Sequence, residues 1–355
     1  MDEHKDELSI VFRVDGDNKL GMGHLTRCLA LAQTIREKVS ANQIFITKGS
    51  REAVARIYLG KQPFRRIPPC LSEAKELVWI TKVLDKLRPD MIVTDLPYTT
   101  EFYLRKLKEH TKLMASIDDL ALIPHCADFV ISGYLSARLK RYRTTNPNTK
   151  FLIGPEYLML RKIFEKMNKT KRRIRKNADT VLVTLGGADP GNLTVKVIRA
   201  LSRIEKKLKI VTVLGPAYNH RLELQRLLIK LAGPKPKLDI RWNVRDMASL
   251  MMKSDVAITA GGETIYELAA TGTPAINVSQ VEHQNINARE LEQAGTVINM
   301  GLGRDVSEDR IADEVLYLLK NRDLRQKMSL AGKKLVDGRG ASRVANLLLE
   351  AMKNR

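Results

Sequence analysis

The chain has 355 residues, of which 44% are hydrophobic, and it carries a formal net charge of +21. A single hydrophobic core usually stops growing at roughly 250–300 residues, so this length predicts two domains. No run approaches the roughly 18 uninterrupted apolar residues of a membrane span, and the opening MDEHKDELSI is unlike a secretory signal, so we expect a cytoplasmic protein. The three cysteines, Cys28, Cys70 and Cys126, are too widely spaced for a disulfide framework or a structural zinc site.

Short β-branched or apolar runs precede helical patterns throughout the chain, and this alternation predicts parallel sheets with crossover helices. In the first half the runs are 9–14, 43–48, 90–95, 112–117 and 128–132. In the second half they are 179–185, 209–215, 238–242, 255–260 and 274–279. We therefore expect an α/β protein with two Rossmann-like, doubly wound domains that face each other across a cleft.

An irregular basic stretch from about residue 135 to 177 separates the two sets of strands. Its segment KMNKTKRRIRKN, residues 166–177, has seven basic residues and no acidic one. The segment lacks the aromatic residues on which bases stack, so we interpret it as a solvated linker rather than an RNA-binding arm. The expected domains are 1–165 and 178–355. The last helical pattern, 341–352, has an apolar stripe that either packs back on the first domain or binds a partner.

In sheets of this kind, ligands bind at the loops that follow the strands. The first such loop contains Asp15 and is followed by Gly21, Gly23 and His24, within GMGHLTRCLALA. It is not the dinucleotide fingerprint, because Thr26 stands where the third glycine would be. The imidazole of His24 either completes a tight turn or acts as a general base. The positive end of the following helix favours its neutral form, which is the form that accepts a proton.

Three aspartates, Asp95, Asp118 and Asp119, directly follow later strands of the first half. Each alone is explained as a helix cap or a turn former. Asp118 and Asp119 together could orient the histidine or hold sugar hydroxyls, although neighbours in the chain seldom point the same way. For the same reason, we do not interpret Cys126 and the preceding histidine as a nucleophile pair.

The second half has two glycine turns, TLGGADPGN and AGGETIYELAATGTP. Gly186 and Gly187 would let the backbone approach a ligand closely. The helix start after Gly262 offers N–H groups and the Thr264 hydroxyl to a diphosphate, and Glu267 lies one turn further on, where it could accept hydrogen bonds from ribose. Gln284 and Asn287 in HQNINARELEQAG are three residues apart, hence on one helix face, and could bind phosphate or sugar. The neighbouring His283 receives no role.

These motifs resemble known families. The runs GGETIYELAATGTPAINV and HQNINARELEQAG resemble the nucleotide-binding domain of GT-B glycosyltransferases of the lipid II N-acetylglucosaminyltransferase type. The motifs RVDGDNKLGMGHLTRCLALA, TDLPY, SIDDL, YLMLRKIF and LGGADPGNLT resemble the UDP-sugar hydrolases of pseudaminic acid biosynthesis and the related spore-coat polysaccharide proteins.

The second resemblance implies release of UDP from a UDP-2,4-diacetamido-2,4,6-trideoxy-L-altrose by water, with inversion, without a metal and without a cofactor. It implies that His24 is the general base. It also implies that four residues face the sugar, namely Asp15, Asp95, Tyr98 and Asp118. We add Gly21 and Gly23 of the glycine turn to this candidate sugar site. The resemblance further implies a nucleotide site formed by Gly186, Gly187, Val244, Gly262, Glu263, Thr264 and Glu267. Gln284, a candidate from the helix motif, completes the expected nucleotide-binding residues. Tyr98 lies three residues after Asp95, one place later than the aromatic residue that is frequent in the family.

Three functions remain open. A hydrolase would release UDP from a UDP-sugar without an acceptor, whereas a GT-B glycosyltransferase would need one. A basic protein that binds nucleic acid would do so with strong salt dependence. The glycine turns and Glu267 favour the first two functions, and the His24 motif favours hydrolysis. The sequence leaves the oligomeric state open.

Overall fold

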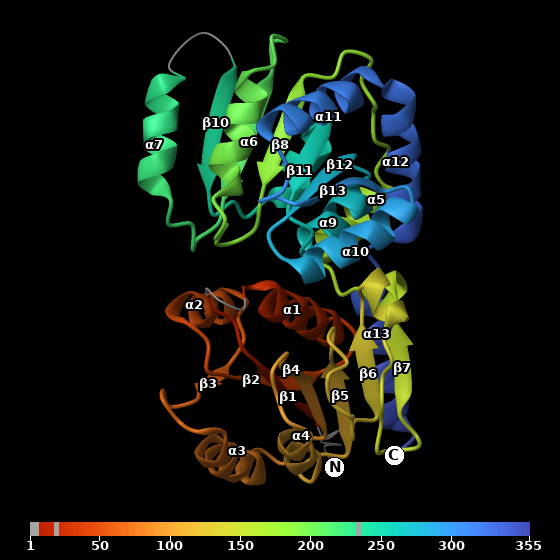
Figure 1. Ribbon diagram of the computed structural model, residues 1–355. Coiled ribbons are helices and arrows are strands. Elements are labelled where there is room, and N and C mark those ends of the chain that lie inside the picture. The colour runs from red at the N-terminus through yellow and green to blue at the C-terminus, as the bar shows by residue number, and fades with distance from the viewer. Residues whose placement is uncertain (1–6, 18–20, 232–235) are drawn as a thin grey trace. The chain divides into compact units, whose positions relative to one another are not determined.

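The computed structural model describes residues 7–17, 21–231 and 236–355. The chain forms two compact units. Unit 1 comprises Met1–Lys162 together with Arg339–Arg355, and unit 2 comprises Ile163–Gly338. Figure 1 shows that each unit contains its own sheet with helices on both faces.

The sheet of unit 1 has seven parallel strands in the order β3-β2-β1-β4-β5-β6-β7. The strands are β1 (Leu8–Val14), β2 (Ala41–Thr47), β3 (Phe64–Arg66), β4 (Met91–Asp95), β5 (Leu113–Ile117), β6 (Phe129–Ser132) and β7 (Lys150–Ile153). The direction of winding reverses between β1 and β4, which pair side by side with Val14 opposite Asp95. Open α/β sheets bind ligands at this switch point, at the carboxyl ends of the strands.

Helices cover both faces of this sheet (Figure 1). They are α1 (Gly23–Arg36), α2 (Arg51–Leu59), α3 (Glu73–Leu87), α4 (Glu101–Lys108) and the final α13 (Gly340–Lys353), with two 3-10 helices, η1 (Leu135–Leu139) and η2 (Pro155–Tyr157). One face packs against α1, α2 and α13, and the other against α3 and α4. The apolar stripe of α13, including Val344 and Leu348, is fully buried in the core of unit 1. The last helix therefore belongs to the first unit.

The sheet of unit 2 has six parallel strands in the order β10-β9-β8-β11-β12-β13, the same winding as the first six of unit 1. The strands are β8 (Thr180–Thr184), β9 (Lys209–Leu214), β10 (Lys237–Trp242), β11 (Val256–Thr259), β12 (Ala275–Ser279) and β13 (Val297–Leu302). The helices are α5 (Lys162–Lys169), α6 (Leu193–Ser202), α7 (Arg221–Lys230), α8 (Met247–Lys253), α9 (Thr264–Thr271), α10 (Glu282–Gln293), α11 (Glu308–Lys320) and α12 (Arg322–Leu335). The switch point of this unit lies between β8 and β11.

The expected fold class, two Rossmann-like α/β domains, is confirmed, and all ten expected runs contain a strand. Three strands, β3, β7 and β13, were not expected. β3 has three exposed residues at a sheet edge, so its burial pattern carries no strand signal. None of the helices that the structure describes has the length and apolar character needed to cross a membrane.

The interpretation of residues 166–177 as a solvated linker is wrong in part. Residues 166–169 complete helix α5. Arg172 donates hydrogen bonds to the backbone oxygens of Met251 and Ser254, and Arg175 binds Asp255. These arginines are held by unit 2 because helix ends and a buried carboxylate supply acceptors that sequence composition does not reveal.

Candidate active site

His24, Asp95 and Arg27 form a hydrogen-bonded cluster at the switch point of unit 1. His24 and Arg27 lie in the first turns of α1, and Asp95 ends β4. His24 Nδ1 lies 2.7 Å from Asp95 Oδ1. Arg27 donates to both oxygens of the same carboxylate, from Nε at 2.6 Å and from Nη2 at 2.8 Å. The Asp95 side chain is 1% exposed, whereas that of His24 is 19% exposed. The imidazole is therefore partly accessible to solvent, while the carboxylate that it contacts is buried.

The charge on Asp95 fixes the tautomer of His24. Burial opposes ionisation of Asp95, but the positive charge of Arg27 and the contact with His24 outweigh it and hold the pKa of Asp95 far below its usual range. A carboxylate only accepts hydrogen bonds, so Nδ1 of His24 carries the hydrogen. The lone pair is then on Nε2. An imidazole held in this way can accept a proton at Nε2.

The adjacent aspartates Asp118 and Asp119 point to different partners. Asp119 accepts hydrogen bonds from Arg27 Nη1 and from the Ser132 hydroxyl, both at 2.6 Å. It therefore belongs to the His24 cluster. Asp118 instead accepts from the backbone N–H of Leu120 at 2.7 Å and lies 2.9 Å from His125 Nε2. Its carboxylate shapes its own loop, which is the structural role that the sequence analysis considered.

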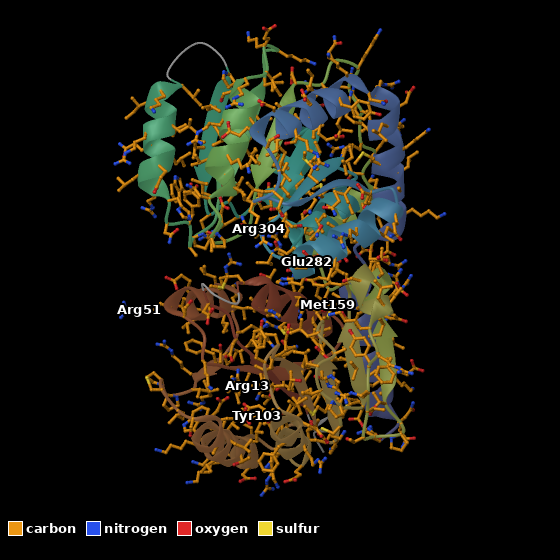
Figure 2. All side chains as sticks on the ribbon, viewed as in Figure 1. Arg13, Arg51, Tyr103, Met159, Glu282 and Arg304 are labelled. Atoms are coloured by element: carbon orange, nitrogen blue, oxygen red, sulfur yellow. The ribbon has the colours of Figure 1, made fainter. Side chains whose placement is uncertain are left out.

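Asp15 belongs to a largely buried ionic network, two members of which, Arg13 and Tyr103, are labelled in Figure 2. Arg13, 2% exposed, donates to both oxygens of Asp15 and also to Glu76 and the Tyr103 hydroxyl. Lys48 donates to Asp15 from its backbone N–H at 2.6 Å. Burial raises the pKa of Asp15, but Arg13 and Lys48 outweigh this effect and lower it below its usual value. Asp15 is thus a fixed anion at the switch point.

The remaining candidates of unit 1 lie on loops at the same end of the sheet. Gly21 has a φ of +82°, a value that favours glycine, and Gly23 begins α1. Residues 18–20 between Asp15 and Gly21 lie outside the described part of the chain. Tyr98 follows β4, and its side chain is 79% exposed.

In unit 2, the loop after β8 contains Gly186 and Gly187. An added Cβ at either glycine would meet no atom within 4 Å, so the backbone there is open to a ligand. Asp189, in the same loop, accepts hydrogen bonds from the N–H groups of Leu193 and Thr194 at the start of α6. Gln280, after β12, donates to Asp189 as well. The loop is therefore held in place from two sides while its glycines stay accessible.

The loop after β11 leads into α9 and contains the second glycine pair. Gly261 has a φ of +81°, and an added Cβ would lie 2.8 Å from Asn277 Oδ1 and 2.9 Å from the Gln284 carbonyl oxygen. Asn287 Nδ2 donates to the Gly261 carbonyl oxygen at 3.2 Å. At Gly262 an added Cβ would meet nothing within 4 Å. The turn is thus tightly packed at Gly261, whereas space remains beside Gly262.

The other candidate nucleotide-binding residues lie before and after this turn in the chain. Glu263 precedes α9, Thr264 is its first residue, and Glu267 lies in its first turn. Gln284 accepts a hydrogen bond from the Gln280 N–H at 3.0 Å, so this amide supports the loop after β12. Val244 follows β10 and is partly buried.

Several residues that position these loops were not singled out from the sequence. Arg27 lies in the α1 motif, one helical turn after His24, and this spacing places both side chains on the same helix face. Asp189 could have been recognised as a capping aspartate before α6. Asn277 is fully buried in β12 and nothing in the local sequence marks it.

The C-terminal part of the chain matches a known domain family. Residues 180–342 match the glycosyltransferase family 28 C-terminal domain. This match contains both glycine turns of unit 2 and the whole of α9.

Three curated proteins illustrate the similarity along the sequence. The chain is 29% identical to the spore coat polysaccharide biosynthesis protein SpsG of Bacillus subtilis, over 94% of this chain and 96% of that protein. It is 31% identical to an uncharacterized protein of Methanocaldococcus jannaschii over 78% of this chain, but spans only 57% of that protein. It is 21% identical to a UDP-N-acetylglucosamine–N-acetylmuramyl-(pentapeptide) pyrophosphoryl-undecaprenol N-acetylglucosamine transferase of Acetivibrio thermocellus, over 94% of this chain and 96% of that protein.

Two solved structures show the same fold. MurG of Acinetobacter baumannii is 15% identical, with a TM-score of 0.68 over 97% of this chain and 99% of that one. MnaA of S. aureus in complex with UDP is 14% identical, with a TM-score of 0.68 over 98% and 97% of the two chains. Both support the assignment of two Rossmann-like domains of the GT-B type.

Proposed function

We propose that the protein is a UDP-sugar-dependent enzyme of polysaccharide biosynthesis that breaks the bond between the anomeric carbon and the diphosphate. In the favoured form of this proposal, the sugar is transferred to a hydroxyl group of an acceptor. The observation that carries the proposal is the contact of 2.7 Å between His24 Nδ1 and the buried, charged Asp95. It orients a base whose other nitrogen has an available lone pair.

In the proposed reaction, Nε2 of His24 takes the proton of the attacking hydroxyl. The oxygen forms a bond to the anomeric carbon, the bond from that carbon to the diphosphate oxygen breaks, and UDP leaves with the bonding electron pair. Asp95 stabilises the imidazolium that forms, and Arg27 keeps Asp95 in place. A single base on one side of the sugar fits a direct displacement with inversion. A positioned base typically accelerates such a step by about 10² to 10⁴.

Unit 2 would bind the nucleotide. The open backbone at Gly262, the first N–H groups of α9 and the Thr264 hydroxyl suit a diphosphate, because a helix N-terminus attracts negative charge. Glu267 suits the ribose hydroxyls, and the backbone near Val244 suits the base. Gly186 and Gly187 would admit the sugar diphosphate close to the loop after β8.

The acceptor is the point on which two candidate functions differ. The family 28 domain match and the similarity to an N-acetylglucosamine transferase favour transfer to a hydroxyl group. The resemblance of the His24 motif and of LGGADPGNLT to UDP-sugar hydrolases favours water as the acceptor and a UDP-2,4-diacetamido-2,4,6-trideoxyhexose as the substrate. The same base serves either acceptor.

One experiment separates the two candidates. The protein is incubated with UDP-N-acetylglucosamine or the UDP-diacetamido sugar in water enriched in oxygen-18, with and without a panel of glycan and lipid-linked acceptors. Transfer predicts that UDP, followed by phosphorus NMR, is released only with an acceptor, and that the sugar appears on that acceptor. Hydrolysis predicts release without an acceptor and oxygen-18 in the free sugar. If no donor releases UDP, with or without an acceptor, the proposal is contradicted.

A further inference from the structure

A groove of about 1300 Å³ lies between residues 171–177 and one side of α12, within unit 2. Asp179, which lines the groove, directly precedes β8, and Arg175, also in the lining, binds Asp255, which directly precedes β11, so the groove lies near the amino ends of these strands. The proposed nucleotide turns follow the carboxyl ends of the same two strands. A five-residue strand is roughly 16 Å long, so the groove and the nucleotide turns are separate.

The groove has a large excess of positive charge. Seven cationic side chains and a single carboxylate, that of Asp179, line it. Arg175 is paired with Asp179 and Asp255. Five others form no ion pair in the described part of the chain, namely Lys171, Arg173, Lys176, Arg322 and Lys333. The proposed reaction uses none of these residues.

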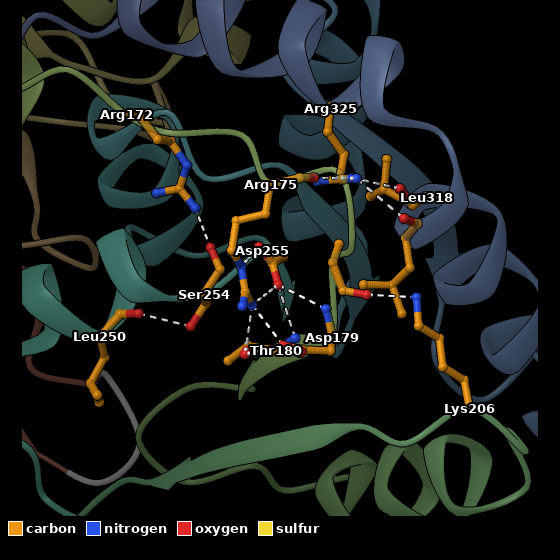
Figure 3. Close-up of polar contacts among 12 residues, drawn as sticks. Arg172, Arg175, Asp179, Thr180, Lys206, Leu250, Ser254, Asp255, Leu318 and Arg325 are labelled. Atoms are coloured by element: carbon orange, nitrogen blue, oxygen red, sulfur yellow. Dashed lines mark hydrogen bonds and ion pairs between the residues drawn. The ribbon is translucent and has the colours of Figure 1, made fainter.

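Two buried arginines, Arg172 in the lining of the groove and Arg325 beside it, donate to backbone carbonyl oxygens rather than to carboxylates (Figure 3). Arg172 donates to the carbonyl oxygens of Met251 and Ser254, and Arg325 to those of Leu318 and Arg175. The first three of these carbonyl groups lie at the ends of α8 and α11 and that of Arg175 lies in a loop, and none of them carries a full negative charge. Nε of Arg172 is buried and has no hydrogen-bond partner among the residues that the structure describes.

The pKa values of two cationic side chains in the groove, those of Arg172 and Lys333, are lowered. Burial lowers the pKa of Arg172 to about 10, although the charge of Asp255 opposes this shift, and the charge of Arg325 adds to it. Burial and the charge of Arg172 also lower the pKa of Lys333. Each cation here would be stabilised by a bound negative charge.

We propose that this groove binds a soluble anion that carries two or more phosphate groups. Arginine and lysine are the usual partners of phosphate, and several cations around one concavity suit a multiply charged ligand. The concave shape favours a small molecule over a membrane surface. The groove contains no aromatic side chain on which a base could stack, which argues against single-stranded nucleic acid.

The test measures binding of inorganic tripolyphosphate by titration calorimetry in the absence of UDP, and the loss of binding in a groove variant separates the groove from the proposed nucleotide turns. The groove variant is Lys171→Gln/Arg173→Gln/Lys176→Gln, in which three exposed side chains without ion-pair partners lose their charge. The control variant Lys207→Gln/Arg226→Gln/Lys230→Gln removes the same charge from exposed positions elsewhere on unit 2. Thermal melting checks that both variants are folded.

We expect wild type and the control variant to bind tripolyphosphate equally, and the groove variant to bind about tenfold more weakly or worse. Equal binding by the groove variant, or no binding by wild type at millimolar ligand and 0.1 M salt, overturns the proposal. Two further arms use vesicles of phosphatidylserine and a single-stranded RNA. Binding to either that depends on the groove, without tripolyphosphate binding, overturns the assignment to a soluble phosphate compound.

Discussion

His24 Nδ1 lies 2.7 Å from Asp95 Oδ1, and Asp95 is 1% exposed while its histidine partner reaches solvent. The pair joins the first turn of a helix to the end of the neighbouring strand β4, at the switch point of the sheet. A carboxylate in this position holds the imidazole in a single tautomer. The proposed catalysis depends on this pair.

Replacing Asp95 tests whether the carboxylate orients the base. In Asp95→Asn, the amide nitrogen cannot accept the Arg27 hydrogen bonds, so at least one buried donor loses its acceptor. We expect the free energy of unfolding to fall by about 1–3 kcal/mol and UDP release to slow by roughly 10² or more. Urea denaturation and initial rates measure the two effects.

A matched control exists at the surface of unit 1. Asp85 contacts His110 Nδ1 at 3.0 Å, but Asp85 is 64% exposed. The variant Asp85→Asn should leave both stability and UDP release nearly unchanged. If Asp95→Asn behaves like Asp85→Asn, Asp95 does not orient a catalytic base.

The two glycines of the α9 turn predict different outcomes for the same substitution. In Gly261→Ala, the new Cβ would lie within 3 Å of Asn277 Oδ1 and of a backbone oxygen, at a φ of +81°. We expect a loss of about 1–3 kcal/mol in the free energy of unfolding as well as a loss of UDP binding. In Gly262→Ala, the Cβ meets nothing within 4 Å, so stability should be kept while the methyl group obstructs the nucleotide. Thermal melting and UDP calorimetry on both variants check this, and unchanged UDP affinity in Gly262→Ala would place the nucleotide elsewhere.

Glu267 provides a test of ribose recognition. It lies in the first turn of α9, and in Glu267→Gln the side chain keeps its shape but loses its charge. Hydrogen bonds from ribose hydroxyls to a carboxylate are stronger than those to an amide, so we expect UDP to bind about 10-fold more weakly. Glu223→Gln, at an exposed position of α7, is the control and should bind UDP as wild type does.

Asp255 predicts a dependence of stability on pH. Burial raises its pKa, but hydrogen bonds from Arg175 and from the N–H groups of Asp179 and Thr180 outweigh this and lower it below its usual value. Its contribution is therefore complete above about pH 4, the ordinary value of an aspartate, and is lost as the pH falls through the lower folded value. Asp255→Asn should be less stable than wild type by about 1–3 kcal/mol at pH 7. Urea denaturation from pH 7 to pH 2 should show this difference shrinking below about pH 4. A difference that stays constant would contradict the assignment.

Much of the fold can be predicted from the sequence, because a strand that is buried on both faces has a continuous run of apolar residues. The runs around Val93 and Ile258 are of this kind, and the glycine turn AGGET after the second of them is also recognisable from the sequence. β3 was not predicted because its three residues are exposed. The contacts of Arg172 and Arg175 were not predicted because their acceptors, backbone oxygens around α8 and the Asp255 carboxylate, lie far away in the chain. His24 was recognisable from its motif, but its orientation depends on Asp95, 71 residues away in the chain.

The role of His24 is measured by UDP release from UDP-N-acetylated sugars, with water and with acceptors, by wild type and His24→Asn, followed by phosphorus NMR. His110→Asn is the control, since its imidazole contacts an exposed aspartate outside the site. We expect release by wild type and by the control, and a loss of about 10² to 10⁴ in rate for His24→Asn, with UDP affinity unchanged. Release by His24→Asn at the wild-type rate would show that His24 is not the base.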